Sequence, residues 1–183
     1  MVSTLSLERT EIISVASGKG GTGKTSILAS LGYALQVSGH KVLFIDTDFA
    51  TDGLSLFLLG PRGWEAMSGL DDGNTFAGYL GRHFVSNSQQ NFPESFKVNR
   101  GRQDDHGQIY DVIISGRNLY GDLPEQMTQL AAPELSREAF RRAVRKFFDY
   151  VRGRKEWDYV LVDTRGGFTF NTTDVCALSD SFF

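Results

Sequence analysis

The chain has 183 residues, of which 40% are hydrophobic and 22% are charged, so its composition suits one folded domain and excludes extensive disorder. A formal net charge of -3 excludes a strongly basic or acidic protein, and any contact with nucleic acid or membrane must use a local patch. The single cysteine, Cys176, excludes an internal disulfide.

Targeting signals are not evident in the sequence. Residues 1–18 lack a basic stretch followed by a long apolar run, and no apolar run approaches the roughly 20 residues that cross a bilayer. The histidines are too far apart in sequence to indicate a metal cluster: His40, His83 and His106. We therefore expect a cytoplasmic protein with no membrane segment in this chain.

Short runs of β-branched or aromatic residues predict the strands of a buried sheet. These runs are Ile12–Ala16, Lys41–Ile45, Ile109–Ile114 and Tyr159–Val162. Between the first two runs, apolar residues recur at helical spacing from Thr25 to Ser38, and Gly39 follows as a stop signal. A strand–helix–strand unit whose strands are apolar on both faces indicates a parallel sheet covered by helices.

A second helix is predicted from Pro133 to Arg152, because its apolar residues repeat on one face. They are Ala139, Phe140, Ala143, Val144, Phe147, Phe148 and Val151. Residues 60–108 are rich in Gly, Asn, Ser, Gln and Asp, so we expect a loop-rich insertion in which Phe76–Phe84 is a candidate helix. No linker of biased composition separates this part, and we expect residues 1–183 to form a single domain.

A phosphate-binding motif follows the first predicted strand. Gly18, Gly23, Lys24 and Thr25 satisfy the pattern G-x-x-x-x-G-K-[ST]. In this pattern backbone N–H groups surround phosphate oxygens, the lysine neutralises them and the hydroxyl binds magnesium. The N-terminus of the following helix adds positive potential at the same place. An ordinary glycine turn between a strand and a helix is the alternative.

The segment KGGTGKT, in which Lys19 precedes the glycine pair, resembles the deviant Walker A motif of the ParA and MinD family of ATPases. The resemblance implies an α/β fold of the P-loop NTPase type, with a doubly wound, mainly parallel sheet flanked by helices. It implies ATP and Mg²⁺ as cofactors, with nucleotide contacts from Gly20, Gly21, Thr22, Gly23, Lys24, Thr25 and Ser26. In the family the extra lysine reaches the partner subunit's nucleotide, so Lys19 is implied to act in trans in an ATP-dependent homodimer. A surface lysine on a loop is the alternative.

Two carboxylates follow the second predicted strand. Asp46 and Asp48 are two residues apart, so in an extended segment they project to the same side, at the strand end where doubly wound sheets bind ligands. The resemblance implies that Asp46 holds a magnesium-bound water and that Asp48 positions the attacking water. Two solvated loop aspartates are the alternative, and Asp52 is interpreted as a turn residue.

Asp163 ends the last predicted strand and resembles the Walker B carboxylate of the family. An aspartate in this place contacts magnesium through water, which completes a predicted metal set of Thr25, Asp46 and Asp163. Gly166 or Gly167 is a candidate amide donor to the γ-phosphate. Many relatives carry proline soon after the aspartate, where this chain has Arg165 and a glycine pair. A surface ion pair is the preferred interpretation of Arg165.

Basic residues line the helix after Pro133 and the turn beyond it, mostly off the apolar face: Arg137, Arg141, Arg142, Arg145, Lys146, Arg152, Arg154 and Lys155. A solvent-exposed face explains them, and a surface for DNA or an acidic partner is the alternative. Members of the resembled family are longer, and this chain stops where a further strand would begin. We therefore expect a C-terminally truncated domain, either a fragment or a natural minimal form.

The resemblance implies a Mg²⁺-dependent ATPase that acts as a dimerising switch with slow hydrolysis. Its output would be partitioning or positioning of a DNA or protein cargo. A nucleotide-binding regulatory module without significant turnover is the alternative. A kinase on the same scaffold would need an acceptor site, and none is recognisable in the sequence.

Overall fold

The computed structural model describes residues 9–48, 51–68, 75–85, 99–100, 110–116 and 133–183. The strands of this part are β1 (Glu11–Val15), β2 (Val42–Asp46), β3 (Asn99–Arg100), β4 (Asp111–Ile113), β5 (Tyr159–Asp163) and β6 (Ser181–Phe182). The helices are α1 (Lys24–Val37), α2 (Gly53–Ser68), α3 (Phe76–Val85), α5 (Pro133–Arg154) and α6 (Phe170–Leu178). Over these residues the sheet has the order β3-β4-β2-β5-β1-β6.

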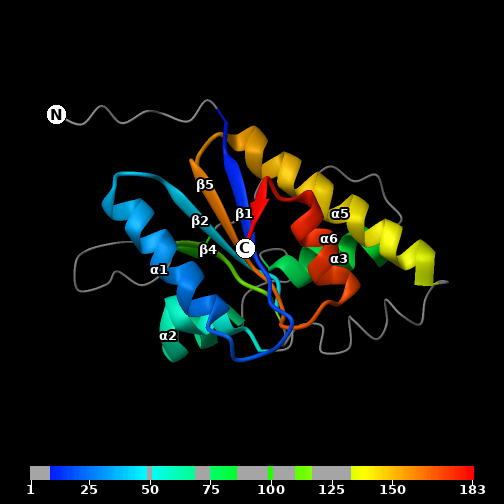
Figure 1. Cartoon of the computed structure of the whole chain (residues 1–183), viewed down its shortest axis with the longest axis horizontal. Helices are drawn as coiled ribbons and strands as arrows, with labels where there is room; N and C mark the ends of the chain where they lie inside the picture. Colours follow the sequence, from blue (N-terminus) through cyan, green and yellow to red (C-terminus); the bar gives the residue numbers. More distant parts are fainter. Residues whose placement is uncertain (1–8, 49–50, 69–74, 86–98, 101–109, 117–132) are drawn as a thin grey trace.

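All neighbouring strands of the described sheet pair in parallel except β3, which pairs antiparallel to β4. Helices α1 and α2 cover one face, and α3, α5 and α6 cover the other (Figure 1). The predicted doubly wound, mainly parallel α/β fold is therefore confirmed. No helix in the described ranges is both long and apolar enough to cross a membrane.

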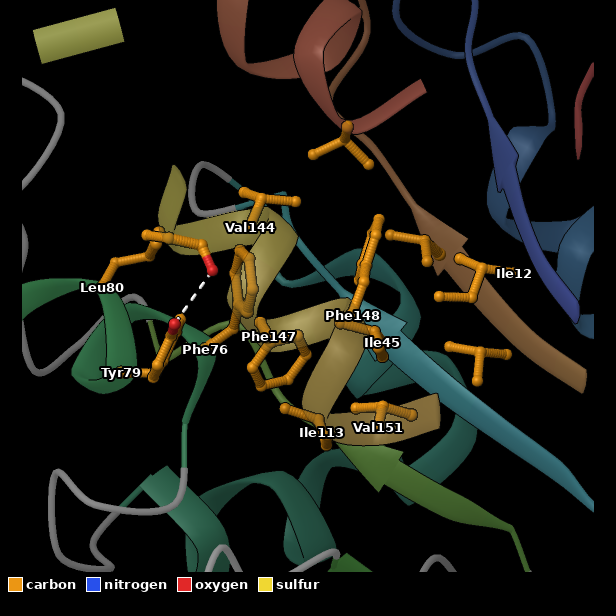
Figure 2. Close-up of a cluster of buried hydrophobic side chains, with 14 of the residues drawn as sticks. Ile12, Ile45, Phe76, Tyr79, Leu80, Ile113, Val144, Phe147, Phe148 and Val151 are labelled. Carbon is orange, nitrogen blue, oxygen red and sulfur yellow. Dashed lines mark hydrogen bonds between the residues drawn. The ribbon is translucent and has the colours of Figure 1, made fainter. Parts of the chain in front are cut away.

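The face of α5 that the sequence predicts to be apolar packs against the sheet. Phe147 and Phe148 are fully buried. The ring of Phe147 packs against Phe76 of α3, with 5.2 Å between the ring centroids, and Phe148 lies toward Ile45 of β2 (Figure 2). The hydroxyl of Tyr79 donates to the carbonyl of Ala143 at 2.9 Å, so the two helices are also joined by a hydrogen bond. This core covers the face of the sheet that lies opposite α1 and α2.

Helix α2 is an element that the sequence pattern does not predict. It begins at Gly53 and extends into the segment 60–108 that was expected to be loop-rich. The helix is kinked at Gly60, where φ is 68°, and Pro61 follows, so a break signal inside the helix hid its continuity. The candidate helix at Phe76–Phe84 is confirmed as α3, and residues 69–74, 86–98 and 101–108 lie outside the described part.

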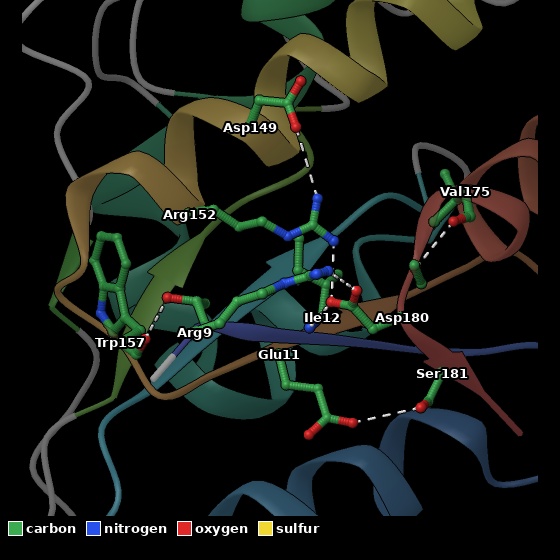
Figure 3. Close-up of polar contacts among 11 residues, drawn as sticks. Arg9, Glu11, Ile12, Asp149, Arg152, Trp157, Val175, Asp180 and Ser181 are labelled. Atoms are coloured by element: carbon green, nitrogen blue, oxygen red, sulfur yellow. Dashed lines mark hydrogen bonds and ion pairs between the residues drawn. The ribbon is translucent and has the colours of Figure 1, made fainter. Parts of the chain in front are cut away.

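Asp180 anchors the segment after β5 to the start of the sheet. Its carboxylate accepts hydrogen bonds from the backbone N–H of Ile12 and from Arg152, each at 2.9 Å, and it also pairs with Arg9 (Figure 3). The backbone N–H of Asp180 donates to the carbonyl of Ile12 at 2.8 Å. These contacts place β6 beside β1, so the residues after the predicted final strand extend the parallel sheet.

Candidate nucleotide-binding site

The phosphate-binding motif lies between the end of β1 and the start of α1, as predicted. Gly21 and Gly23 have φ angles of 72° and 84°, in the left-handed region that glycine adopts without strain. Gly23 is the N-cap of α1 and makes no side-chain capping bond, and the loop from Gly18 to Gly23 is exposed. The first turn of α1 therefore presents backbone N–H groups toward solvent, the arrangement that binds phosphate.

Thr25, in the first turn of α1, contacts Asp163 at the end of β5. The Thr25 hydroxyl donates to Asp163 Oδ2 at 2.6 Å, while Asp163 Oδ1 is buried without a hydrogen-bond partner in the described part of the chain. Burial raises the pKa of Asp163 to about 6, against the hydrogen bond from Thr25 and the charge of Lys24, which lower it. The negative charge of Asp48 also raises this pKa.

Asp46 is fully buried at the end of β2, next to Asp163 in the register of the sheet. Its Oδ1 accepts from the Asp48 N–H at 3.0 Å, and its Oδ2 accepts from the N–H and hydroxyl of Ser55 at 2.9 and 2.7 Å. Burial raises the pKa of Asp46 to about 7, and the charge of Asp163 adds to this rise, while the bonds from Ser55 and Asp48 oppose it. The expected metal role of Asp46 stays a prediction, and both of its carboxylate oxygens accept hydrogen bonds from protein donors in this structure.

Asp48 is half-buried, and its Oδ2 accepts from the Thr51 hydroxyl at 2.8 Å. Asp46 and Asp48 therefore differ in environment, although the sequence predicts that both project to the same side. The backbone N–H of Asp52 donates to the carbonyl of Asp48 at 3.1 Å, and the φ of Asp52 is 51°, so the interpretation of Asp52 as a turn residue is confirmed.

The loop after β5 lies against the phosphate-binding loop. A Cβ atom on Gly166 would be 2.8 Å from the backbone nitrogen of Gly20, so the two backbones touch. The N–H of Gly167 donates to the carbonyl of Ser17 at 2.9 Å, which corrects its candidate role as a donor to phosphate. The Thr164 hydroxyl donates to the carbonyl of Val15 at 2.6 Å. The sequence carries no signal for this contact beyond the glycine pair itself.

The side chain of Lys19 is exposed on the phosphate-binding loop, and that of Arg165 is exposed on the loop after β5. Neither forms an ion pair within the ranges that the structure covers, so the surface ion pair expected for Arg165 is not found there. The structure thus brings together Lys24, Thr25 and Asp163, and it leaves both cations open to solvent. Groups of three or more metal-ligating His, Cys, Asp or Glu side chains are absent from these ranges.

A family model described as the CobQ/CobB/MinD/ParA nucleotide binding domain matches residues 13–134. The septum site-determining protein MinD of Synechocystis is 55% identical over 47 residues, which are 26% of this chain and 18% of that protein.

The fold is similar to that of pNOB8 ParA bound to nonspecific DNA. The TM-score is 0.65 at 21% identity, over 94% of this chain and 52% of the other. It is also similar to cobyrinic acid a,c-diamide synthase of Mycobacterium smegmatis with bound ATP analogue and magnesium, with a TM-score of 0.63 at 20% identity, over 94% and 57% of the two chains. This chain thus spans about half the length of these two structures.

Proposed function

Since this chain belongs to the CobQ/CobB/MinD/ParA family of nucleotide-binding domains, we propose that it is an ATP-dependent switch. ATP binding joins two copies, and slow hydrolysis separates them. The observation that carries this proposal is the contact of Thr25 with Asp163 beside Lys24, at the end of a parallel sheet. This combination of hydroxyl, carboxylate and lysine is what a triphosphate with a divalent cation requires.

Nucleotide binding is assigned to the loop and first turn that precede and begin α1. These residues are Gly20, Gly21, Thr22, Gly23, Lys24, Thr25 and Ser26. Their exposed backbone N–H groups and the N-terminus of α1 attract the phosphates, and Lys24 adds a full positive charge. Lys24 is half-buried, and its charge lowers the pKa of Asp163.

The site has oxygen ligands suited to magnesium. Mg²⁺ is held in such sites by few protein oxygens, the substrate phosphates and several waters. The Thr25 hydroxyl and the unpaired Asp163 Oδ1 would hold the ion, which would neutralise charge on the β- and γ-phosphates. A buried carboxylate oxygen without a partner is costly, and a hydrated cation relieves this cost.

Hydrolysis and dimerisation are assigned to Asp48 and Lys19. Asp48 follows the end of β2, which pairs with the end of β5 that carries Asp163, and from there its carboxylate would orient an attacking water. Lys19 is exposed on the phosphate-binding loop, and its charge is free to reach the nucleotide of a second copy. Stabilisation of the transition state by a positive charge from a second subunit is known to accelerate phosphoryl transfer.

The output of the switch is partitioning or positioning of DNA or of a protein complex. The solved pNOB8 ParA structure contains nonspecific DNA, and the exposed cations Arg142, Arg145 and Lys146 of α5 provide a basic surface on this chain. A regulatory module that binds nucleotide without turnover remains the competing function, and hydrolysis measurements distinguish the two.

ATP binding and hydrolysis, measured with and without magnesium, test the proposal on the parent chain and on Lys24→Ala. Light scattering follows the oligomeric state in parallel. We expect ATP-dependent dimers in the parent, loss of binding in Lys24→Ala, and a lasting ATP-bound dimer in Asp48→Ala. ATP binding and dimerisation without turnover in the parent would favour the regulatory module, and equal binding by Lys24→Ala would contradict the assigned site.

A further inference from the structure

Ser55 belongs to none of the sequence motifs, yet it donates the two shortest hydrogen bonds that the buried carboxylate of Asp46 accepts. Ser55 lies in the first turn of α2, and both it and Asp46 have a relative exposure of 0%. The Ser55 N–H and hydroxyl both donate to Asp46 Oδ2, at 2.9 and 2.7 Å. The carboxylate of Asp46 thus joins the end of β2 to the first turn of α2.

The other oxygen of Asp46 holds the segment that carries Asp48. Asp46 Oδ1 accepts from the backbone N–H of Asp48 at 3.0 Å. Asp48 in turn accepts from the Thr51 hydroxyl through its side chain and from the Asp52 N–H through its carbonyl, at 2.8 and 3.1 Å. Asp46 therefore accepts hydrogen bonds from Asp48, which follows β2, and from Ser55, which lies in α2. The described residues between Asp48 and α2, Thr51 and Asp52, are bonded to Asp48.

The start of α2 also lies close to the phosphate-binding loop. A Cβ atom on Gly53 would be 3.6 Å from the Thr25 hydroxyl oxygen, so Gly53 is in near contact with the residue that bonds Asp163. A shift of the first turn of α2 would therefore change the surroundings of the Thr25 hydroxyl. The position of α2 consequently matters to the site, although none of its side chains belongs to the motif.

The acceptor capacity of Asp46 explains how these contacts act together. A carboxylate offers about four lone-pair sites, and the donors from Ser55 and Asp48 occupy all but one of them. Asp163, by contrast, has a buried oxygen with no hydrogen-bond partner in the described residues. The two neighbouring carboxylates thus differ: Asp163 keeps one oxygen without a protein donor in the described residues, and both oxygens of Asp46 accept from the protein.

We propose that Ser55 is a positioning residue, which acts through Asp46 to hold Asp48 in the place from which it would face the nucleotide. This inference rests on the proposed ATPase function for its consequence in catalysis. Its structural part, the ordering of the Asp48 backbone by Ser55, stands without that function.

Amide hydrogen exchange of the nucleotide-free chain tests the structural part. Ser55→Ala removes the hydroxyl donor, and Ser55→Thr keeps it. Ser14→Ala is the matched control, because Ser14 is equally buried and its hydroxyl has no hydrogen-bond partner in the described residues. We expect exchange at the Asp48 amide to be about tenfold faster in Ser55→Ala, since the hydroxyl hydrogen bond that holds Asp46 is lost, and unchanged in Ser14→Ala and Ser55→Thr.

Steady-state kinetics test the catalytic consequence in the same variants. In Ser55→Ala we expect kcat for ATP hydrolysis to fall about tenfold while the Kd for Mg-ATP stays the same, because a misplaced water-orienting group slows chemistry without removing phosphate contacts. Unchanged exchange at Asp48, or unchanged kcat with faster exchange, would overturn the proposal. A parent chain that binds but does not hydrolyse ATP would refute the proposed function, and the exchange result would still decide whether Ser55 orders this segment.

Discussion

The contact between Gly166 and Gly20 predicts that a single methyl group in the loop after β5 weakens nucleotide binding. In Gly166→Ala the new Cβ atom would lie 2.8 Å from Gly20 N and 2.9 Å from Gly20 Cα. Both are backbone atoms, so no side chain can rotate away. To restore an ordinary contact of 3.4 Å, the two loops must separate by about 0.6 Å.

The free chain can relieve this contact by moving its exposed glycine loop, whereas bound phosphate needs the loop in place. The strain is therefore expected in binding, where overpacking of this kind costs about 1–2 kcal/mol, and the Kd for Mg-ATP should rise about 5- to 30-fold. Isothermal titration calorimetry measures the change. Gly153→Ala is the control, because a Cβ atom on Gly153 would have nothing within 4 Å. A Kd within about twofold of the parent, in a Gly166→Ala variant that unfolds at the parent's temperature, would refute the reasoning.

Two other predictions concern stability. Burial raises the pKa of Asp163 to about 6 and that of Asp46 to about 7, from 3.8 in both cases. The folded chain thus binds protons more tightly than the unfolded chain. The free energy of unfolding without nucleotide should therefore decrease as the pH rises from about 4 to about 7. Asp163→Asn should reduce this fall in urea titrations, and a rise with pH would contradict the assignment. Arg137 forms two hydrogen bonds with the buried Asp174, at 3.0 and 2.9 Å, so Arg137→Ala should lower the Tm. Arg145→Ala is the control and should lower the Tm less, because Arg145 is exposed and has no ion pair in the described ranges. Equal Tm values of the two variants in calorimetry would disprove this.

The parts of the site that the sequence predicts correctly are those whose signals are local. The phosphate-binding motif combines a strand, a glycine-rich turn and a helix within one continuous segment, so the positions of Lys24 and Thr25 follow from the pattern. Asp163 follows from the same logic, because an apolar strand that ends in aspartate places the carboxylate at the carboxyl edge of the sheet. The resemblance to the ParA and MinD family rests on this local motif, and the family match confirms it.

The parts that the sequence does not predict depend on contacts between distant segments. Asp46 and Asp48 are alike in sequence, and their different environments arise because α2 brings Ser55 onto Asp46. Helix α2 was itself hidden by Gly60 and Pro61. The approach of Gly166 to the phosphate-binding loop likewise needs β5 to lie beside β1, a pairing between residues far apart in the chain.

Backbone contacts couple the three segments of the site, and this coupling gives a physical basis for a switch. The carbonyl of Asp163 accepts from both the N–H and the hydroxyl of Thr47, at 3.0 and 2.7 Å, which ties the end of β5 to the segment that carries Asp48. On its other side the loop after β5 is bonded to Ser17 through Gly167. In the proposed switch, a phosphate that moved the glycine loop would therefore also displace the residues that follow β5 and β2. Because packed elements move between discrete arrangements and do not deform continuously, the proposed loss of a γ-phosphate would be expected to release both sets of residues together.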